Sequence, residues 1–241
     1  MNAKHLLMLA LASVFCLTSC WDNSGEEYLY TNMYSFGDVR SGQIKIESEG
    51  LTLNITEDKS DGKWVDHDHI FFCCDVLRMT AAGVYDIRMN AYEPVVEQAA
   101  LVKSRTSESV YGSDAVSFYQ DWGLDAKNRK LNMSCLTTSR TKSETVHSVN
   151  LVYDDIRSHK DTIFFELRHQ GQGESYENEV YPADDFQLDT HYITFDFSQC
   201  IPADAGTHII ISIEWDWLVN EGGSLGREVE HKQECGVLTL R

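Results

Sequence analysis

The feature that most constrains the fold is a period of two in the apolar residues, which recurs along the chain without sustained helical periodicity. Ile163, Phe165 and Leu167 would share one face of an extended segment, and polar or aromatic residues occupy the positions between and around them. Side chains alternate between the two faces of a β-strand, so such a segment predicts a strand with one buried face. The pattern recurs at residues 51–55, 149–151, 193–197 and 209–217.

Short alternating segments separated by polar turns favour an antiparallel all-β protein. A parallel sheet would need helical crossover connections, and the sequence lacks the helical periodicity for them. The chain has 241 residues, of which 42% are hydrophobic, so it is long enough for one large or two small domains with a packed core. We therefore expect an all-β fold.

The first twenty residues have the order of regions typical of a bacterial lipoprotein signal. Lys4 precedes an apolar run at residues 6–17, and residues 17–20 resemble a lipobox that ends in Cys20. The run is shorter than the roughly 20 apolar residues that a transmembrane helix needs. The segment therefore predicts a cleaved signal, and the alternative is an ordinary secretory signal with a cysteine nearby.

The lipobox predicts a protein that is held at the cell envelope by lipid. We expect signal peptidase to remove residues 1–19, and the thiol of Cys20 to carry the lipid that inserts in the membrane. Two or three acyl chains make a lasting anchor, because each buried methylene contributes about 0.8 kcal/mol. Residues 20–36 begin acidic and polar, and we expect them to form a lipidated tether.

A polar, unpatterned stretch at residues 103–109 separates two strand-rich blocks, and we place a domain boundary at residue 108. The block at 37–108 holds four or five expected strands and suits a small β-barrel. The block at 109–241 has the length of a β-sandwich. Residues 70–74 are apolar at every position, as expected of a strand whose outer side is covered by a neighbouring domain.

The charge of the chain argues against one class of partner. The sequence has 38 Asp and Glu against 20 Lys and Arg, which gives a formal net charge of −18, and its cations form no stripe. Tight binding to nucleic acid needs clustered cations. We expect no nucleic-acid partner.

Five cysteines remain once the signal and the lipidated residue are set aside, so a monomer has at least one unpaired thiol. Cys73 and Cys74 would point to opposite faces of a strand, and no pair has the spacing of zinc ligands. We expect small buried hydrophobic residues with at most one disulfide. The five are Cys73, Cys74, Cys135, Cys200 and Cys235.

Metal binding has a weak basis in the sequence. His67 and His69 would lie on one face of a strand, and a third ligand such as His169 would have to come from elsewhere in the fold to complete a zinc site. Two histidines at the start of a strand are more commonly surface residues. A calcium site would lack the glycine and the glutamate of an EF-hand loop; its ligands would be Asp61, Asp66 and Asp68. We expect no metal site.

Catalysis has a similarly weak basis. Glu214 and Asp216 would face one way on a strand about 7 Å apart, a separation that suits acid and base catalysis on a sugar. Trp215 and Trp217 continue the apolar phase of the preceding isoleucines, which favours core tryptophans and solvent-facing acids. No nucleophile elbow, phosphate-binding loop or dinucleotide-binding turn occurs in the sequence. We expect a non-catalytic protein without a cofactor.

Aromatic residues near expected turns are the remaining candidates for a ligand site. A flat ring can cover the apolar face of a sugar, and binding residues tend to lie in loops. The candidates are Trp64, Trp122, Tyr111 and Tyr119. A glycan-binding lipoprotein is therefore one alternative to a lipoprotein that binds a protein partner or a component of the cell envelope. A fimbrillin-like adhesin subunit, which polymerises by strand exchange, is another.

A set of short motifs together resembles the NigD-like lipoproteins of Bacteroidetes. The lipobox is followed by the motifs at residues 86–90, 121–123, 147–152 and 166–170, and residues 154–155 and 195–197 fit the family as well. The resemblance spans most of the mature chain. It implies an OB-like barrel followed by a β-sandwich on an outer-membrane lipoprotein, periplasmic or surface-facing. The family's association with a bacteriocin locus would allow a protein partner, and no catalytic residue is carried over.

Overall fold

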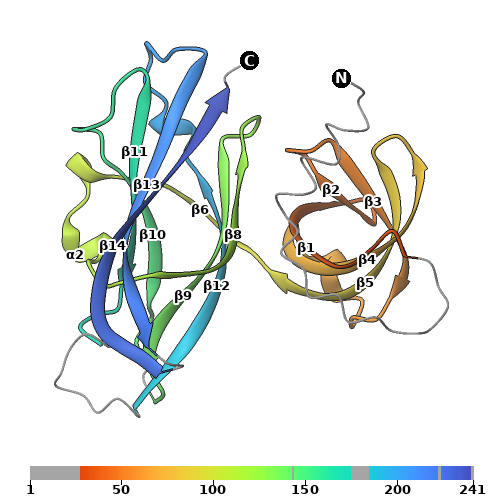
Figure 1. Ribbon diagram of the computed structural model, residues 1–241, viewed down its shortest axis with the longest axis horizontal. Coiled ribbons are helices and arrows are strands. Elements are labelled where there is room, and N and C mark those ends of the chain that lie inside the picture. The colour runs from red at the N-terminus through yellow and green to blue at the C-terminus, as the bar shows by residue number, and fades with distance from the viewer. Residues whose placement is uncertain (1–27, 143, 175–184, 222–223, 240–241) are drawn as a thin grey trace.

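The computed structural model describes residues 28–142, 144–174, 185–221 and 224–239, which form two units of β-strands side by side (Figure 1). Helical structure in this part of the chain is confined to short turns of helix. No helix within the described ranges has the length and apolarity needed to cross a membrane. The expected all-β fold is confirmed.

The N-terminal unit is a closed barrel of five strands. In order around the barrel they are β1 (Tyr30–Arg40), β2 (Gln43–Ile46), β3 (Leu51–Asp58), β5 (Val84–Pro94) and β4 (His69–Ala81). β3 and β5 are parallel, and the other neighbours are antiparallel. The resemblance implied an OB-like barrel, and the OB fold likewise has five strands.

Alternate side chains of the barrel strands fill its interior. Ile70, Phe72 and Cys74 of β4 point inward and are fully buried. β1 and β2 approach so closely that a Cβ atom on Gly37 would lie 2.3 Å from the Ile44 side chain, which explains the glycine there. The period of two that predicted the strands therefore also predicts which side chains form the core.

The C-terminal unit is a sandwich of a five-stranded and a four-stranded sheet. The first has the order β14 (Ser224–Thr239), β13 (His208–Glu221), β11 (Thr162–Gln170), β10 (Ser148–Tyr153), β7 (Leu101–Val102). The second has the order β6 (Val96–Ala99), β12 (Phe186–Asp196), β9 (Lys130–Arg140), β8 (Ser117–Asp125). The strand faces predicted to be apolar meet between the two sheets and are buried there.

Three strand pairs of the sandwich are parallel, although the sequence pattern favoured antiparallel strands throughout. They are β10 with β7, β11 with β13, and β12 with β6. A parallel pair needs a long crossover, and we had expected such a crossover to be helical. Between β11 and β13 the crossover instead includes β12 of the opposite sheet, so no helix is required.

The chain passes from barrel to sandwich between Pro94 and Val96, upstream of the boundary placed at residue 108. β6 and β7 both belong to the sandwich. They are too short to show the alternation of apolar residues that predicts a strand. The polar stretch predicted to hold the boundary instead forms η2 (Lys103–Arg105) and α2 (Glu108–Tyr111). At the other end, β1 begins within the expected tether.

The barrel packs against the sandwich through an aromatic stack. Phe71 on the outer face of β4 stacks on Tyr192 of β12, with ring centroids 4.4 Å apart and planes 16° apart. Lys127 in the β8–β9 turn forms an ion pair of 2.9 Å with Glu47 of the barrel. The expectation that the apolar strand at residues 70–74 is covered on its outer side by a neighbouring domain is confirmed.

Replacing Phe71 with alanine is expected to loosen the barrel from the sandwich while leaving both folded. The substitution removes a stack that contributes about 1 kcal/mol beyond its buried area and leaves the barrel core untouched. Small-angle scattering should show a larger radius of gyration and a broader distance distribution. An exposed control, Val65→Ala, should change neither quantity, and an unchanged profile for Phe71→Ala would contradict the role of the stack.

Candidate functional site

The two carboxylates considered for catalysis lie on the outer face of the five-stranded sheet, among opposite charges. Glu214 and Asp216 alternate with the inward tryptophans of β13, and Trp215 is buried in the core. Glu166 of β11 is the register partner of Glu214. Arg168 donates to Asp216 at 3.0 Å and to Glu166 at 2.9 Å. The carboxylates of the two strands are therefore joined by one guanidinium.

Glu214 is held by a second arginine. Arg157 donates two hydrogen bonds to its carboxylate, at 2.8 and 2.6 Å, and its guanidinium lies 4.4 Å from the centre of the Phe164 ring. The hydrogen bonds from Arg157 lower the pKa of Glu214 despite its partial burial. A carboxyl group with a lowered pKa is ionised near neutral pH and cannot serve as the general acid of a glycosidase. The arrangement favours a structural role for the pair.

The most buried charges of this face surround Lys103, which comes from the segment that follows β7. Its ammonium lies 2.9 Å from Asp154 and 2.5 Å from Glu166. Burial alone would raise the pKa of Asp154, but the hydrogen bonds from Lys103 and from two backbone amides lower it overall. We call this set the outer ion-pair network; it comprises Lys103, Asp154, Arg157, Glu166, Arg168, Glu214, Asp216 and His231.

A second polar cluster lies inside the sandwich, at one end of its core. His169 lies on the inner face of β11, and its Nε2 atom is 3.2 Å from Nδ1 of His147. The other nitrogen of His147 is 3.5 Å from Glu174. Burial, and then the charges of His147 and His191, lower the pKa of His169 to about 3. His169 is therefore a neutral core residue near pH 7.

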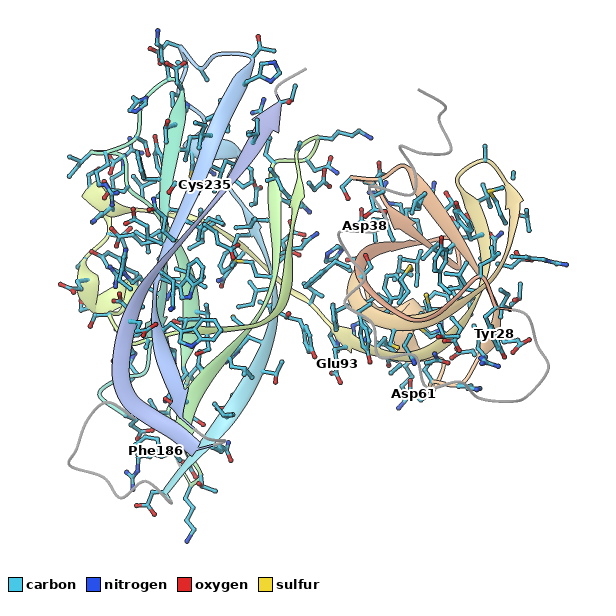
Figure 2. All side chains as sticks on the ribbon, in the orientation of Figure 1. Tyr28, Asp38, Asp61, Glu93, Phe186 and Cys235 are labelled. Atoms are coloured by element: carbon cyan, nitrogen blue, oxygen red, sulfur yellow. The ribbon has the colours of Figure 1, made fainter. Side chains whose placement is uncertain are left out.

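The hollow between the barrel and the sandwich is small. It lies beside Asp38, which Figure 2 labels on the barrel side facing the sandwich, and Asp38 accepts a 2.8 Å hydrogen bond from His69. The enclosed space is about 20 Å³, enough for a water molecule. Ligand pockets for metabolites are many times larger. The hollow therefore does not suit a metabolite.

The prediction that Trp64 belongs to a sugar-binding surface is wrong, because its side chain is buried. Its side chain is 6% exposed within the barrel core, and its Nε1 donates to Asp58 at 2.8 Å. A ring buried in this way presents no face to a sugar. Tyr111 lies half-buried at the end of α2, where its carbonyl oxygen accepts from Asn150. The side chains of Trp122 and Tyr119 lie outside the described residues.

The residues considered for metal binding are not brought together. His67 and His69 belong to the barrel, whereas His169 is in the sandwich core. Asp61 caps its own loop by accepting from the Lys63 amide and the Tyr92 hydroxyl. Across the described ranges, no group of three or more His, Cys, Asp or Glu side chains could hold a metal ion.

The cysteines follow the expected pattern in four of five positions. Cys73, Cys74, Cys135 and Cys200 are buried, and Cys235 is exposed on β14 (Figure 2). All five are free thiols, so the described part of the chain contains no disulfide. Cys20, the predicted lipidation site, lies outside the described residues.

Motif residues of the first domain proved to be structural. Asp86 and Arg88 face outward on β5, where Asp86 accepts from Arg78 at 2.7 Å and Arg88 donates to Asp75 at 2.8 Å. Ile87, between them, is fully buried. Arg157, Lys103 and His191 sit in no recognised motif and were not predicted as site residues. Lys103 and Arg157 lie outside the strands and meet their partners only because the folded sheet brings β10, β11 and β13 side by side.

Comparison with known proteins places the sandwich in a family. Residues 98–210 match the NigD-like C-terminal beta sandwich domain, and the match begins inside β6. No curated protein matches the sequence.

Solved structures share the fold across both units. A protein of unknown function from Bacteroides vulgatus is 15% identical, with a TM-score of 0.57 over 86% of this chain and 90% of that one. A candidate lipoprotein from Bacteroides fragilis is 13% identical, with a TM-score of 0.52 over 84% and 96%. A NigD-like immunity protein from Bacteroides caccae is 13% identical, with a TM-score of 0.52 over 85% and 92%.

These comparisons agree with the motifs and with the order of barrel and sandwich. At such low identity the solved structures establish the fold alone, while the domain match establishes the family of the sandwich. The resemblance found in the sequence is thereby confirmed: residues 98–210 of this chain match the family of NigD-like C-terminal β-sandwich domains.

Proposed function

We propose that this chain is a non-catalytic lipoprotein of the outer membrane that acts by binding a protein partner. The observation that carries the proposal is the state of its charged groups. Glu214, Asp216 and Glu166 are each bound by an arginine or a lysine. Carboxylates held by cations in this way stabilise a rigid surface and are not presented as free groups to a substrate.

The space inside the protein supports the same conclusion. The hollow between the two units admits about one water molecule. Trp64, one of the aromatic residues predicted to bind a sugar, is buried in the barrel core. That hollow has no room for a metabolite, whereas the exposed faces of the described strands offer a wide surface for recognition. A protein partner suits such flat faces better than a small molecule does.

The lipid anchor rests on the sequence, where an n-region, an apolar run and a lipobox precede Cys20 in order. A structural neighbour described as a candidate lipoprotein supports it. Another neighbour is described as a NigD-like immunity protein. These similarities are of fold, so they guide the experiments below.

The alternative of a polymerising adhesin is less favoured. β14 is paired with β13 of the same chain from Glu221 opposite Ser224 to His208 opposite Thr239, with one register shift between Leu218 and Asn220. A strand that is already paired in its own sheet is not available to a neighbouring subunit without first leaving it. The glycan-binding alternative now depends on Tyr111, Tyr119 and Trp122.

Replacing Cys20 with serine is expected to abolish the lipid modification. The thiol is the atom to which the lipid would be attached, and a hydroxyl does not replace it in that reaction. Cells fed an alkyne-labelled palmitate should yield a labelled wild-type protein and an unlabelled variant, and the variant should leave the membrane fraction. Cys235→Ser is the matched control and should remain labelled. A wild-type protein without label would overturn the anchor.

The binding of a protein partner is tested by photo-crosslinking in the producing cells. A photoreactive residue is placed at Ile156 or Val237, which are exposed on the sandwich, and at Val65 on the barrel. The proposal expects a crosslinked adduct of one mass, which forms from some of these positions and not from others. Absence of an adduct from positions spread over both units would contradict it, as would turnover of a polysaccharide that Glu214→Gln abolishes.

A further inference from the structure

The start of β1 shows where the anchored end of the chain meets the barrel. Tyr30 is the register partner of Val76, and the amide of Leu29 donates to the Val76 carbonyl at 2.9 Å. Arg88 lies over the ring of Tyr28, 4.7 Å from its centre. Figure 2 labels Tyr28 on the side of the barrel that faces away from the sandwich. The predicted tether therefore joins the barrel and not the sandwich.

The direction of this segment points to one hairpin. β1 is antiparallel to β4, so the chain followed backward from Tyr30 runs along β4 toward the β4–β5 turn. We call residues 79–83 the β4–β5 tip. Cys20 precedes Tyr28 by eight residues, which span at most about 29 Å when extended. Lipid on Cys20 would hold this side of the barrel close to the membrane.

The tip has the chemistry of a surface that meets lipid. Met79 is 57% exposed, and Thr80, Ala81 and Ala82 are exposed as well. No acidic residue occurs from residue 77 to residue 85, in a chain that has 38 acids. Arg78 at its base has a side chain that is 74% exposed, and its guanidinium forms a 2.7 Å ion pair with Asp86. An apolar tip without acidic residues suits contact with a membrane surface.

Two acidic side chains near the tip are held in ion pairs. Asp86 is bound by Arg78, and Glu47 in the neighbouring β2–β3 turn is bound by Lys127 of the sandwich. This turn approaches the tip, since the Gly50 carbonyl oxygen lies 3.1 Å from the position of a Cβ atom on Gly83. The turn carries Glu47 and Glu49, whereas the tip carries no acidic residue, so the tip is the part suited to lipid.

We infer that the β4–β5 tip contacts the phospholipid surface in which Cys20 is anchored, so that the barrel lies next to the membrane and the sandwich projects away from it. The inference rests on the proposed lipid anchor. The tip alone is too small to bind a bilayer stably, because it offers one methionine and two alanines. The tether makes the contact intramolecular and supplies a high effective concentration.

The test places an environment-sensitive nitrobenzoxadiazole label on Met79→Cys, in lipidated full-length protein that also carries Cys235→Ser to remove the exposed native thiol. The matched control carries the label on Ile156→Cys, an exposed position of the sandwich. Both proteins are placed in vesicles of phosphatidylethanolamine and phosphatidylglycerol. Emission from position 79 should shift to the blue and rise severalfold, and spin-labelled lipids should quench it, while position 156 stays unchanged.

Three outcomes would overturn the inference or its basis, and they are distinguishable. Mass spectrometry that finds no lipid on Cys20 removes the proposed anchor. A lipidated protein whose label at position 79 is quenched by aqueous iodide as strongly as that at position 156 overturns the contact alone. A blue shift that persists in detergent and grows with protein concentration assigns the tip to a second copy of the chain. Met79→Asp, in a lipidated protein labelled at Ala81→Cys, should abolish the shift.

Discussion

Replacing Lys103 with methionine is expected to destabilise the sandwich by about 3 kcal/mol. The ammonium lies between Asp154 and Glu166, whose side chains are 3% and 8% exposed. Removing one partner of a buried ion pair leaves charge without compensation, and such losses cost about 3–5 kcal/mol; we take the lower end because Lys103 is itself 31% exposed. Chemical denaturation followed by tryptophan fluorescence measures the change.

Lys232→Met is the matched control, because Lys232 forms an ion pair with Glu230 near the sheet edge where both side chains are well exposed. Its loss should cost at most about 1 kcal/mol. Combining Lys103→Met with Asp154→Asn should recover part of the loss, since Lys103 is the cation that pairs with this buried carboxylate, whereas Glu166 keeps its ion pair with Arg168. A Lys103 variant as stable as the control would show that the buried carboxylates do not depend on this lysine.

Below pH 6.5 the protein is expected to lose stability with a slope that depends on His169. Burial, then the charges of His147 and His191, lower the pKa of His169 to about 3, so the native protein keeps it neutral in that range. The unfolded chain takes up the proton near pH 6.5. Between pH 6.5 and 3 the unfolded state thus binds more protons than the native state. The free energy of unfolding therefore decreases as the pH is lowered across that window.

The size of this effect follows from linkage. One group contributes about 1.4 kcal/mol per pH unit, so wild-type protein at pH 5 should have lost about 2 kcal/mol that His169→Gln does not lose. Asp114 and Glu174 also lie beside this histidine pair, which is why the slope is compared between variants and not read from wild type alone. His208→Gln, at an exposed position, should keep the wild-type slope. Equal slopes for wild type and His169→Gln would refute the assignment.

Much of the fold could be predicted because its signal is local. The faces of β11, β12 and β13 could be assigned from residues two apart, since a pleated strand turns alternate side chains to opposite sides whatever its neighbours are. Phe165 and Phe195 are fully buried for this reason. The covered strand at residues 70–74 was predictable in the same way, because apolar residues on both faces need two apolar environments.

Pairings between distant segments could not be predicted in this way. Arg157 meets Glu214 across 57 positions, and Lys103 meets Glu166 across 63. Both contacts depend on the parallel alignment of β11 with β13 and on the path of the chain after β7. The alternation of apolar residues carries no signal for either contact. The sequence therefore predicts the acidic residues of this face but not the cations that pair with them.

Trp64 shows the same division. Its position between polar residues indicates a loop, and Lys63–Asp66 is indeed a short helical turn outside the strands. Only closure of the barrel decides that the ring turns inward and bonds to Asp58. Alternation along the chain by itself determined the class of fold and most of its core. The tertiary structure alone decided which charges are neutralised and which aromatic rings are covered, because both depend on segments that meet only after folding.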